Sequence, residues 1–167
     1  MKTATAHTVT RTLLALLAVL TLLASFAACA TSSNADYYFQ TADGAKISIG
    51  ADEKAVLDKL GKPVSETSSA SCGGFEGKDY VYTFKGFRVS TTPSADGQIV
   101  CKIELTDDSV KTPEGLYIGM SEADAKDAMK GKTSEGTGGN LVYSSDVTKL
   151  QVIIRDGSVA GIVYVAK

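Results

Sequence analysis

The side chains that could carry chemistry in this 167-residue chain are carboxylates and cysteines, because the single histidine, His7, lies close to the N-terminus. Beyond His7, Ser-His-Asp triads, Cys-His nucleophiles and His-ligated zinc are excluded. The carboxylates gather at Glu104 with 107–108, and at 52–53. A catalytic carboxylate pair must face across a cleft, whereas neighbours in a linker or helix start act as caps, turns and solvated charge. We therefore predict no catalytic residues, no metal and no cofactor.

The first 28 residues have the layout of a secretory signal. Lys2 and Arg11 form a basic region, and an apolar run follows over residues 13–26. This run is 14 residues long, whereas a membrane-spanning helix needs roughly 20. We therefore predict that the segment is removed. It ends in Phe26, Ala27, Ala28 and Cys29.

These four residues resemble the bacterial lipobox, in which a bulky apolar residue and two small residues precede a cysteine. The resemblance implies cleavage before Cys29 and a diacylglyceryl group on its thiol, although Phe26 stands where the family usually has leucine. Each buried CH₂ of such an anchor contributes roughly 0.8 kcal/mol. The alternative is ordinary secretion, since Ala28-Cys29-Ala30 also fits an A-x-A cleavage site.

Cleavage before Cys29 leaves 167 − 28 = 139 residues, which suits one domain or two small units sharing a core. The leader holds two of the 17 basic side chains and none of the 19 acidic ones, so the remainder has a net charge of 15 − 19 = −4. Without a basic tract, a nucleic-acid partner is excluded. Residues 29–36 are small and polar, as suits a flexible tether.

Two further cysteines, Cys72 and Cys101, follow the leader. In an oxidising exterior an even pair is a candidate disulfide, which would tie a glycine-rich loop to a strand. The alternative is two unpaired thiols, one of them a small core residue.

The chain contains the same unit twice, because residues 49–60 align without gaps on 118–129. Each segment starts with an apolar residue and a glycine, followed by a helix N-cap, Asp52 or Ser121. Apolar residues at i and i+4 then predict a short helix with one buried face. The match resumes downstream, where 80–83 aligns with 141–144, 87–91 with 150–154, and 96–105 with 156–165.

Each unit is predicted to continue as three antiparallel strands, with Asp96-Gly97 and Asp156-Gly157 as hairpin turns. A lead-in strand is predicted before each helix at 45–49 and 116–118, and a further strand at 37–40 pairs with 45–49. Period-two alternation predicts which residues of the last strands lie under the helices. They are Ile99, Cys101, Ile103 and Leu105, and in the second unit Val159, Gly161, Val163 and Val165.

We therefore predict an α+β fold made of two tandem repeats, each a helix plus an antiparallel meander, with both helices packed on one face of a sheet. The predicted boundaries are a signal at 1–28, a tether at 29–36, a first repeat at 37–105, a linker at 106–115 and a second repeat at 116–167.

The run Gly-Met-Ser-Glu-Ala-Asp-Ala at 119–125, followed by a short helix and a meander and repeated in tandem, resembles the β-lactamase-inhibitor-protein-like fold. One unit is similar to the small lipoprotein subunit of the outer-membrane β-barrel assembly machinery, and the whole mature chain to uncharacterised lipoproteins of anaerobic Gram-positive bacteria. The resemblance implies a module that binds proteins or envelope components with an open sheet face and performs no chemistry.

Aromatic residues are the candidate partner contacts, because rigid rings often anchor interfaces. The alternative is that they complete the core beneath the helices. The candidates are Tyr80, Tyr82, Tyr143 and Tyr164.

We thus expect a lipid-anchored, extracytoplasmic, non-catalytic module for protein binding or envelope structure. Its expected partners are the membrane, through the N-terminal lipid, and an envelope or extracellular protein. The alternatives are a small surface hydrolase that uses a carboxylate pair, and a soluble secreted inhibitor of an extracellular enzyme.

Overall fold

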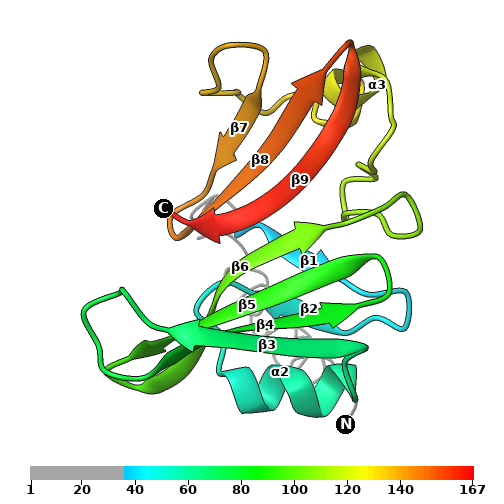
Figure 1. Cartoon of the computed structure of the whole chain (residues 1–167). Coiled ribbons are helices and arrows are strands. Elements are labelled where there is room, and N and C mark those ends of the chain that lie inside the picture. The colour runs from blue at the N-terminus through cyan, green and yellow to red at the C-terminus, as the bar shows by residue number, and fades with distance from the viewer. Residues whose placement is uncertain (1–35) are drawn as a thin grey trace, which may run out of the picture. The chain divides into compact units, whose positions relative to one another are not determined.

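The computed structural model describes residues 36–167 (Figure 1). The predicted signal, the lipobox with Cys29, and all but the last residue of the predicted tether lie outside the described residues. Of the described residues, 45% are in strands and 11% in helices. The protein is therefore mostly β.

Seven strands form one antiparallel sheet in the order β3-β4-β5-β6-β9-β8-β7. Because β6 pairs with β9, the sheet runs continuously through both predicted repeats. The strands are β3 (Ser65–Ala70), β4 (Lys78–Phe84), β5 (Phe87–Ser94), β6 (Gly97–Leu105), β7 (Leu141–Ser144), β8 (Thr148–Arg155) and β9 (Ser158–Ala166).

A separate two-stranded sheet and two short helices complete the described part of the chain. The small sheet pairs β1 (Tyr38–Gln40) with β2 (Lys46–Ser48), which confirms the predicted hairpin across residues 42–44. The helices are α2 (Glu53–Leu60), which contacts β6, and α3 (Glu122–Ala128), which contacts β9.

The predicted α+β class, with two helix-plus-meander repeats packed on a sheet, is wrong. Each helix buries a single residue, Val56 in α2 and Ala125 in α3, so the helices cover little of the sheet. The β1–β2 hairpin supplies fully buried Phe39 and Ile47 instead. The ring of Phe39 lies 4.7 Å from that of Phe87, centroid to centroid. A β-hairpin therefore packs on the sheet where helices alone were expected.

The two predicted repeats also differ in strand number. Four strands follow α2 and three follow α3, because the hydroxyl-rich residues 65–70 form β3, which the sequence pattern did not predict. The predicted lead-in strand at 116–118 is not a strand, although the one at 45–49 is present as β2.

The predicted alternation holds on only one side of a β-bulge in the last strand of each unit, where Ile103, Leu105 and Val159 are buried as predicted. In β6 the pairing shifts between Ser90 and Thr91 of the neighbouring strand, which leaves Cys101 as the extra residue. In β9 the corresponding shift leaves Ala160 as the extra residue. One extra residue reverses the face of everything beyond it. The buried residues are Val100, Ile103 and Leu105, and Val159, Ile162 and Tyr164.

The two helix starts dock alike on these bulged strands. Gly50 N–H donates to the carbonyl of Val100, and Gly119 N–H donates to that of Val159, each at 2.8 Å. The predicted N-caps are confirmed: Asp52 accepts from the amide of Ala55 at 2.8 Å and Ser121 from that of Asp124 at 3.1 Å. Each helix is thus held by its first turn rather than by a broad apolar face.

Candidate protein-binding edge

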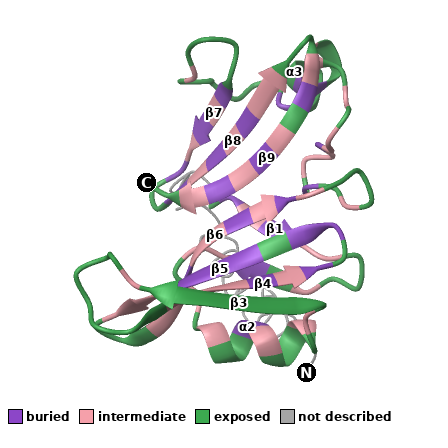
Figure 2. Ribbon diagram, in the orientation of Figure 1, coloured by how far each residue is buried: buried purple, intermediate pink, exposed green. Residues whose placement is uncertain are grey.

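Within residues 36–167, strand β3 is an edge of the large sheet and pairs only with β4, from Ser65 opposite Thr83 to Ala70 opposite Lys78. All six of its residues are exposed. Figure 2 shows β3 as the one strand of the sheet that is exposed along its whole length. An exposed edge strand presents backbone N–H and C=O groups that another strand can bind.

The pairing of β3 with β4 determines which of its amides are free. Ser71 N–H donates to the carbonyl of Gly77 at 3.1 Å, at the loop end of the hairpin. Because antiparallel hydrogen-bonded pairs recur at every second residue, the amides of residues 65, 67 and 69 face β4. The N–H and C=O groups of Glu66, Ser68 and Ala70 therefore face outward.

The opposite edge of the sheet, β7, is covered by the chain itself. Glu135 N–H donates to the carbonyl of Val142 at 2.8 Å, and Val142 N–H donates to the hydroxyl of Ser134 at 3.1 Å. By contrast, β3 has no lysine, proline or bulge of the kind that protects natural edge strands. The β3 edge is therefore the side of the sheet open to strand addition.

Two exposed apolar side chains flank β3. Val64 precedes the strand and is 77% exposed, and Phe75, in the loop that follows, is 48% exposed. Single exposed apolar side chains are ordinary on a protein surface, so these two matter here for their position at the two ends of the open strand. We call β3 with Val64 and Phe75 the β3 edge.

A half-buried carboxylate fixes the strands behind the β3 edge. Glu53 Oε1, in the first turn of α2, accepts from the hydroxyls of Tyr82 at 2.8 Å and Thr91 at 2.7 Å. Burial, and next the hydrogen bond to Glu53, raise the pKa of Tyr82 above its ordinary value. The acidic pair at 52–53 is thus structural, since Asp52 caps the helix and Glu53 ties it to β4 and β5.

The buried tyrosines should make the protein unstable in alkali. Burial is the main cause that raises the pKa of both Tyr82 and Tyr164, whereas an unfolded tyrosine ionises near pH 10. Above about pH 10 the unfolded state loses protons that the folded state keeps, so the free energy of unfolding falls as pH rises toward the folded-state pKa values. The melting temperature should be constant from pH 8 to about 9.5 and should then fall as the pH rises further. Tyr164→Phe should flatten that fall, and a melting temperature constant to pH 11 would contradict the prediction.

The candidate partner-contact tyrosines do not form an open aromatic face. Tyr82, Tyr143 and Tyr164 are 5%, 3% and 0% exposed, because they point to the covered side of the sheet. Tyr80 is half-buried and its ring stacks on that of Tyr82, with centroids 5.9 Å apart. Tyr82, Tyr143 and Tyr164 therefore fit the alternative that the tyrosines complete the core, whereas Tyr80 lies at the margin of the core.

The acidic cluster at 104–108 has structural partners as well. Glu104 lies 3.8 Å from Arg88 and 3.5 Å from Lys102, in partly exposed ion pairs. Asp107 accepts from the amide of Ser109 at 2.8 Å. Hydrogen bonding to the side chain of Ser109, and next to its amide, lowers the pKa of the Asp107 carboxyl. Within residues 36–167, no group of three His, Cys, Asp or Glu side chains is arranged to hold a metal ion.

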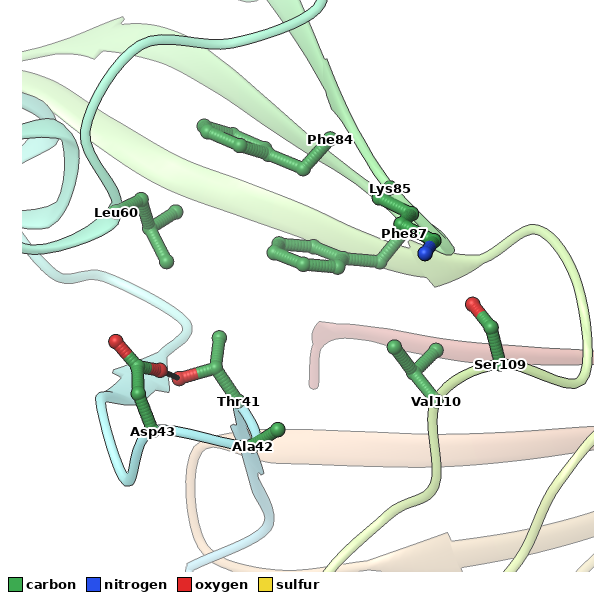
Figure 3. Close-up of a pocket in the computed structure, with 9 residues that line it drawn as sticks. All are labelled: Thr41, Ala42, Asp43, Leu60, Phe84, Lys85, Phe87, Ser109 and Val110. Atoms are coloured by element: carbon green, nitrogen blue, oxygen red, sulfur yellow. Dashed lines mark hydrogen bonds between the residues drawn. The ribbon is translucent and has the colours of Figure 1, made fainter.

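A cavity of about 410 Å³ lies where the β1–β2 turn, the β4–β5 turn, the C-terminal end of α2 and residues 109–110 meet (Figure 3). Phe84 and Phe87 form an apolar wall, with ring centroids 5.1 Å apart. Across from them, Asp43 accepts a hydrogen bond from the Thr41 hydroxyl, which lowers the pKa of Asp43. Its volume is in the range of small-molecule sites, but Asp43 is the single carboxylate among its lining residues. This cavity therefore does not supply the carboxylate pair that a hydrolase would need.

The two described cysteines lie in different surroundings. Cys72 is exposed in the loop between β3 and β4, and Cys101 is partly buried at the bulge of β6, with its sulfur 3.4 Å from the carbonyl oxygen of Ser90. Both thiols are free in the structure. The candidate disulfide is therefore not formed in this structure, and its existence is open to a direct chemical test.

Alkylation should distinguish the two thiols. Burial is the main cause that raises the pKa of Cys101, and only the thiolate reacts. We expect iodoacetamide at pH 8 to label Cys72 at least about tenfold faster than Cys101, because Cys72 is also the more accessible. Peptide mass spectrometry without reductant measures both rates. Labelling of neither residue until a reductant is added would instead demonstrate the disulfide.

No protein-family model, no curated protein and no solved structure matches the chain. In the described part of the chain, the helices are too short and too polar to cross a membrane.

The β3 edge was not predicted because Ser-Glu-Thr-Ser-Ser-Ala has no apolar alternation. One signal was available. The glycine-rich stretch at 71–77 stands directly before the predicted strand at 80–83, and such a stretch can join two strands of a hairpin. This position predicts a second strand directly before the glycine-rich stretch, at the residues that form β3.

Proposed function

We propose that this chain is a lipid-anchored, extracytoplasmic module that binds protein by strand addition at the β3 edge and catalyses no reaction. The observation that carries the proposal is the unpaired, fully exposed edge β3, with outward amides at Glu66, Ser68 and Ala70. Main-chain hydrogen bonds give such binding its affinity, and flanking side chains give it specificity.

The described carboxylates support a non-catalytic role because they are used to hold the fold. Glu53 joins α2 to two strands, Asp52 caps a helix, and Asp43 is held in a turn by Thr41. These carboxylates are held apart by their own hydrogen-bond partners, whereas a catalytic pair must share one cleft.

The anchoring part of the proposal is supported by the lipobox-like residues at 26–29. We expect cells fed an alkyne-tagged fatty acid to label the chain, and Cys29→Ser to abolish the label and release the protein into the medium. Mass spectrometry should find the mature N-terminus at a diacylated Cys29. An unmodified terminus at Thr31 would overturn the anchor and favour the secreted alternative.

The binding part is tested with a photo-crosslinking amino acid placed at Ser68, in the middle of β3. After irradiation of intact cells, we expect a discrete protein adduct. The matched control carries the same group at Asp146, which is exposed in the β7–β8 turn, and should give none. Equal adducts at both positions, or none at either, would overturn strand addition at this edge.

A further inference from the structure

We infer that the partner of the β3 edge is the β3 edge of a second copy of this chain, paired antiparallel about a two-fold axis through Ser68. The inference rests on the proposed binding at this edge and goes further by naming the occupant. Two-fold dimers are the commonest oligomers, and their interface uses the same surface of both copies.

The outward amides select this register. A two-fold axis at Ser68 places Ser68 opposite its own copy and Glu66 opposite Ala70 of the second copy, at both ends. All three outward residues are then in hydrogen-bonded pairs, each of which exchanges two N–H···O bonds. An axis at Thr67 or Ser69 would leave one of the three outside such a pair. The register through Ser68 therefore uses every free amide of β3.

Charge complementarity supports the same register. Ala70 lies opposite Lys78 within one chain, so Glu66 of the second copy, Ala70 and Lys78 form a row on one face of the joined sheet. Adjacent strands are about 4.8 Å apart, and the small Ala70 side chain lets the long Glu66 and Lys78 side chains meet across it. Among residues 36–167, Lys78 forms no ion pair, so its ammonium is free for this contact.

The exposed apolar residues also match an antiparallel pair. Val64 lies at one end of β3 and Phe75 lies in the loop beyond the other end. In the register through Ser68, Val64 reaches the level of residue 72 of the second copy, which lies in the loop that holds Phe75. Val64 of each copy is thus brought to the end where Phe75 of the other is exposed. A foreign peptide would explain the free amides but not these paired positions.

The symmetry is compatible with two copies on one membrane. A two-fold axis that relates antiparallel strands of one sheet is perpendicular to that sheet, so equivalent faces of both copies lie on the same side. A common anchor would also raise the effective concentration of a short edge-to-edge contact. We therefore expect weak pairing in dilute solution and extensive pairing on a membrane.

Disulfide trapping at Ser68 tests the axis. The full chain carries Cys72→Ser and Cys101→Ser, with and without Ser68→Cys, and is purified in detergent. A hydrogen-bonded pair has Cα atoms about 5.5 Å apart, within the range that a disulfide spans. We expect Ser68→Cys to form a covalent dimer at least about tenfold faster than Asp146→Cys in the same background. Equal rates would overturn the inference.

Mixed variants test the register. The axis places Thr67 opposite Ser69 of the second copy, so Thr67→Cys and Ser69→Cys should crosslink when mixed and much less when each is alone. If each crosslinks as well alone as in the mixture, the register through Ser68 is wrong. These rates are measured by gel electrophoresis without reductant, with tagged and untagged chains to identify mixed dimers.

A third variant separates loss of pairing from loss of folding. The N–H of Ser68 faces outward, so Ser68→Pro removes a donor to the second copy and none to β4; proline is tolerated at such edge positions. We expect circular dichroism to show that Ser68→Pro remains folded. Under conditions in which the parent chain sediments as a dimer, Ser68→Pro should sediment as a monomer. A parent that is monomeric both in detergent and on vesicles overturns the inference.

The photo-crosslinked adduct at Ser68 distinguishes this inference from the proposed function. An adduct with the mass of two copies of the chain supports both. An adduct that contains a different protein overturns the second copy as occupant and leaves the binding function standing. If no adduct forms, both the proposed binding function and the second copy as its partner are overturned.

Discussion

Replacing Phe39 with alanine is expected to destabilise the protein by about 3–5 kcal/mol, because a fully buried ring is lost from a close-packed site. Phe39 is 0% exposed, and its ring lies 4.7 Å from that of Phe87 and 6.5 Å from that of Tyr164, centroid to centroid. These partners belong to β5 and β9, which lie on either side of β6. Phe39 thus holds the β1–β2 hairpin on the centre of the sheet.

The matched control is Tyr38→Ala, which removes a ring of similar size from the neighbouring residue. Tyr38 is only partly buried, and the ammonium of Lys46 lies 4.4 Å from its ring centroid. An exposed cation–π contact is worth about 0.5–1 kcal/mol. Urea unfolding of both variants should show a much larger loss for Phe39→Ala. Similar losses would mean that the hairpin does not pack on the sheet as described.

Replacing Gly86 with alanine should destabilise the turn between β4 and β5 by about 2–5 kcal/mol, the sum of a left-handed backbone cost and overpacking. Gly86 has φ +84°, and an added Cβ would lie 2.5 Å from Ser109 Oγ and 2.8 Å from Val110 Cγ1. Its carbonyl also accepts from Thr106 N–H at 2.8 Å. In Gly86→Ala, residues 106–110 would therefore have to move away from the β4–β5 turn.

Gly115→Ala serves as the control for Gly86→Ala, because Gly115 has φ +90° and no atom within 4 Å of an added Cβ. It should show the backbone cost alone, about 1–2 kcal/mol. Thermal unfolding measures the difference between the two variants. Equal destabilisation would show that the contact with Ser109 and Val110 relaxes without cost, and would contradict the close packing described here.

Local signals in the sequence predicted local structure well. Asp52 and Ser121 cap helices as expected, since a cap depends only on residues three positions away. The hairpin turn at 156–157 and the β1–β2 pairing also follow from neighbouring residues. The β5–β6 turn lies at residues 95–96, one residue before the predicted Asp96-Gly97 turn. The burial of Tyr82 and Tyr164 could not be predicted in the same way. Alternation assigns each tyrosine to a face of the sheet, but it does not show which face the rest of the chain covers.

The bulges show why the predicted core of the second unit failed. Gapless alignment of the Asp-Gly turns equates Ile99 with Val159, whereas the structure equates Val100 with Val159 through their shared bonds to the helix starts. Cys101 and Ala160 carry no sequence mark of a bulge. Each is recognised as the extra residue of a bulge only when the pairing with the neighbouring strand is known. The bulge at Ala160 reverses the faces of the residues after it and so places Tyr164 in the core.

The carboxylates and cysteines with which the sequence analysis began are determined only in part by the sequence. It establishes their number, the absence of a histidine after His7, and the lipobox-like residues that predict the anchor. The tertiary structure decided that Glu53 joins α2 to β4 and β5, that Cys101 lies at a bulge, and that residues 65–70 form an open edge. Caps and turns depend on neighbours in the chain, whereas edges and bulges depend on which distant strands pair.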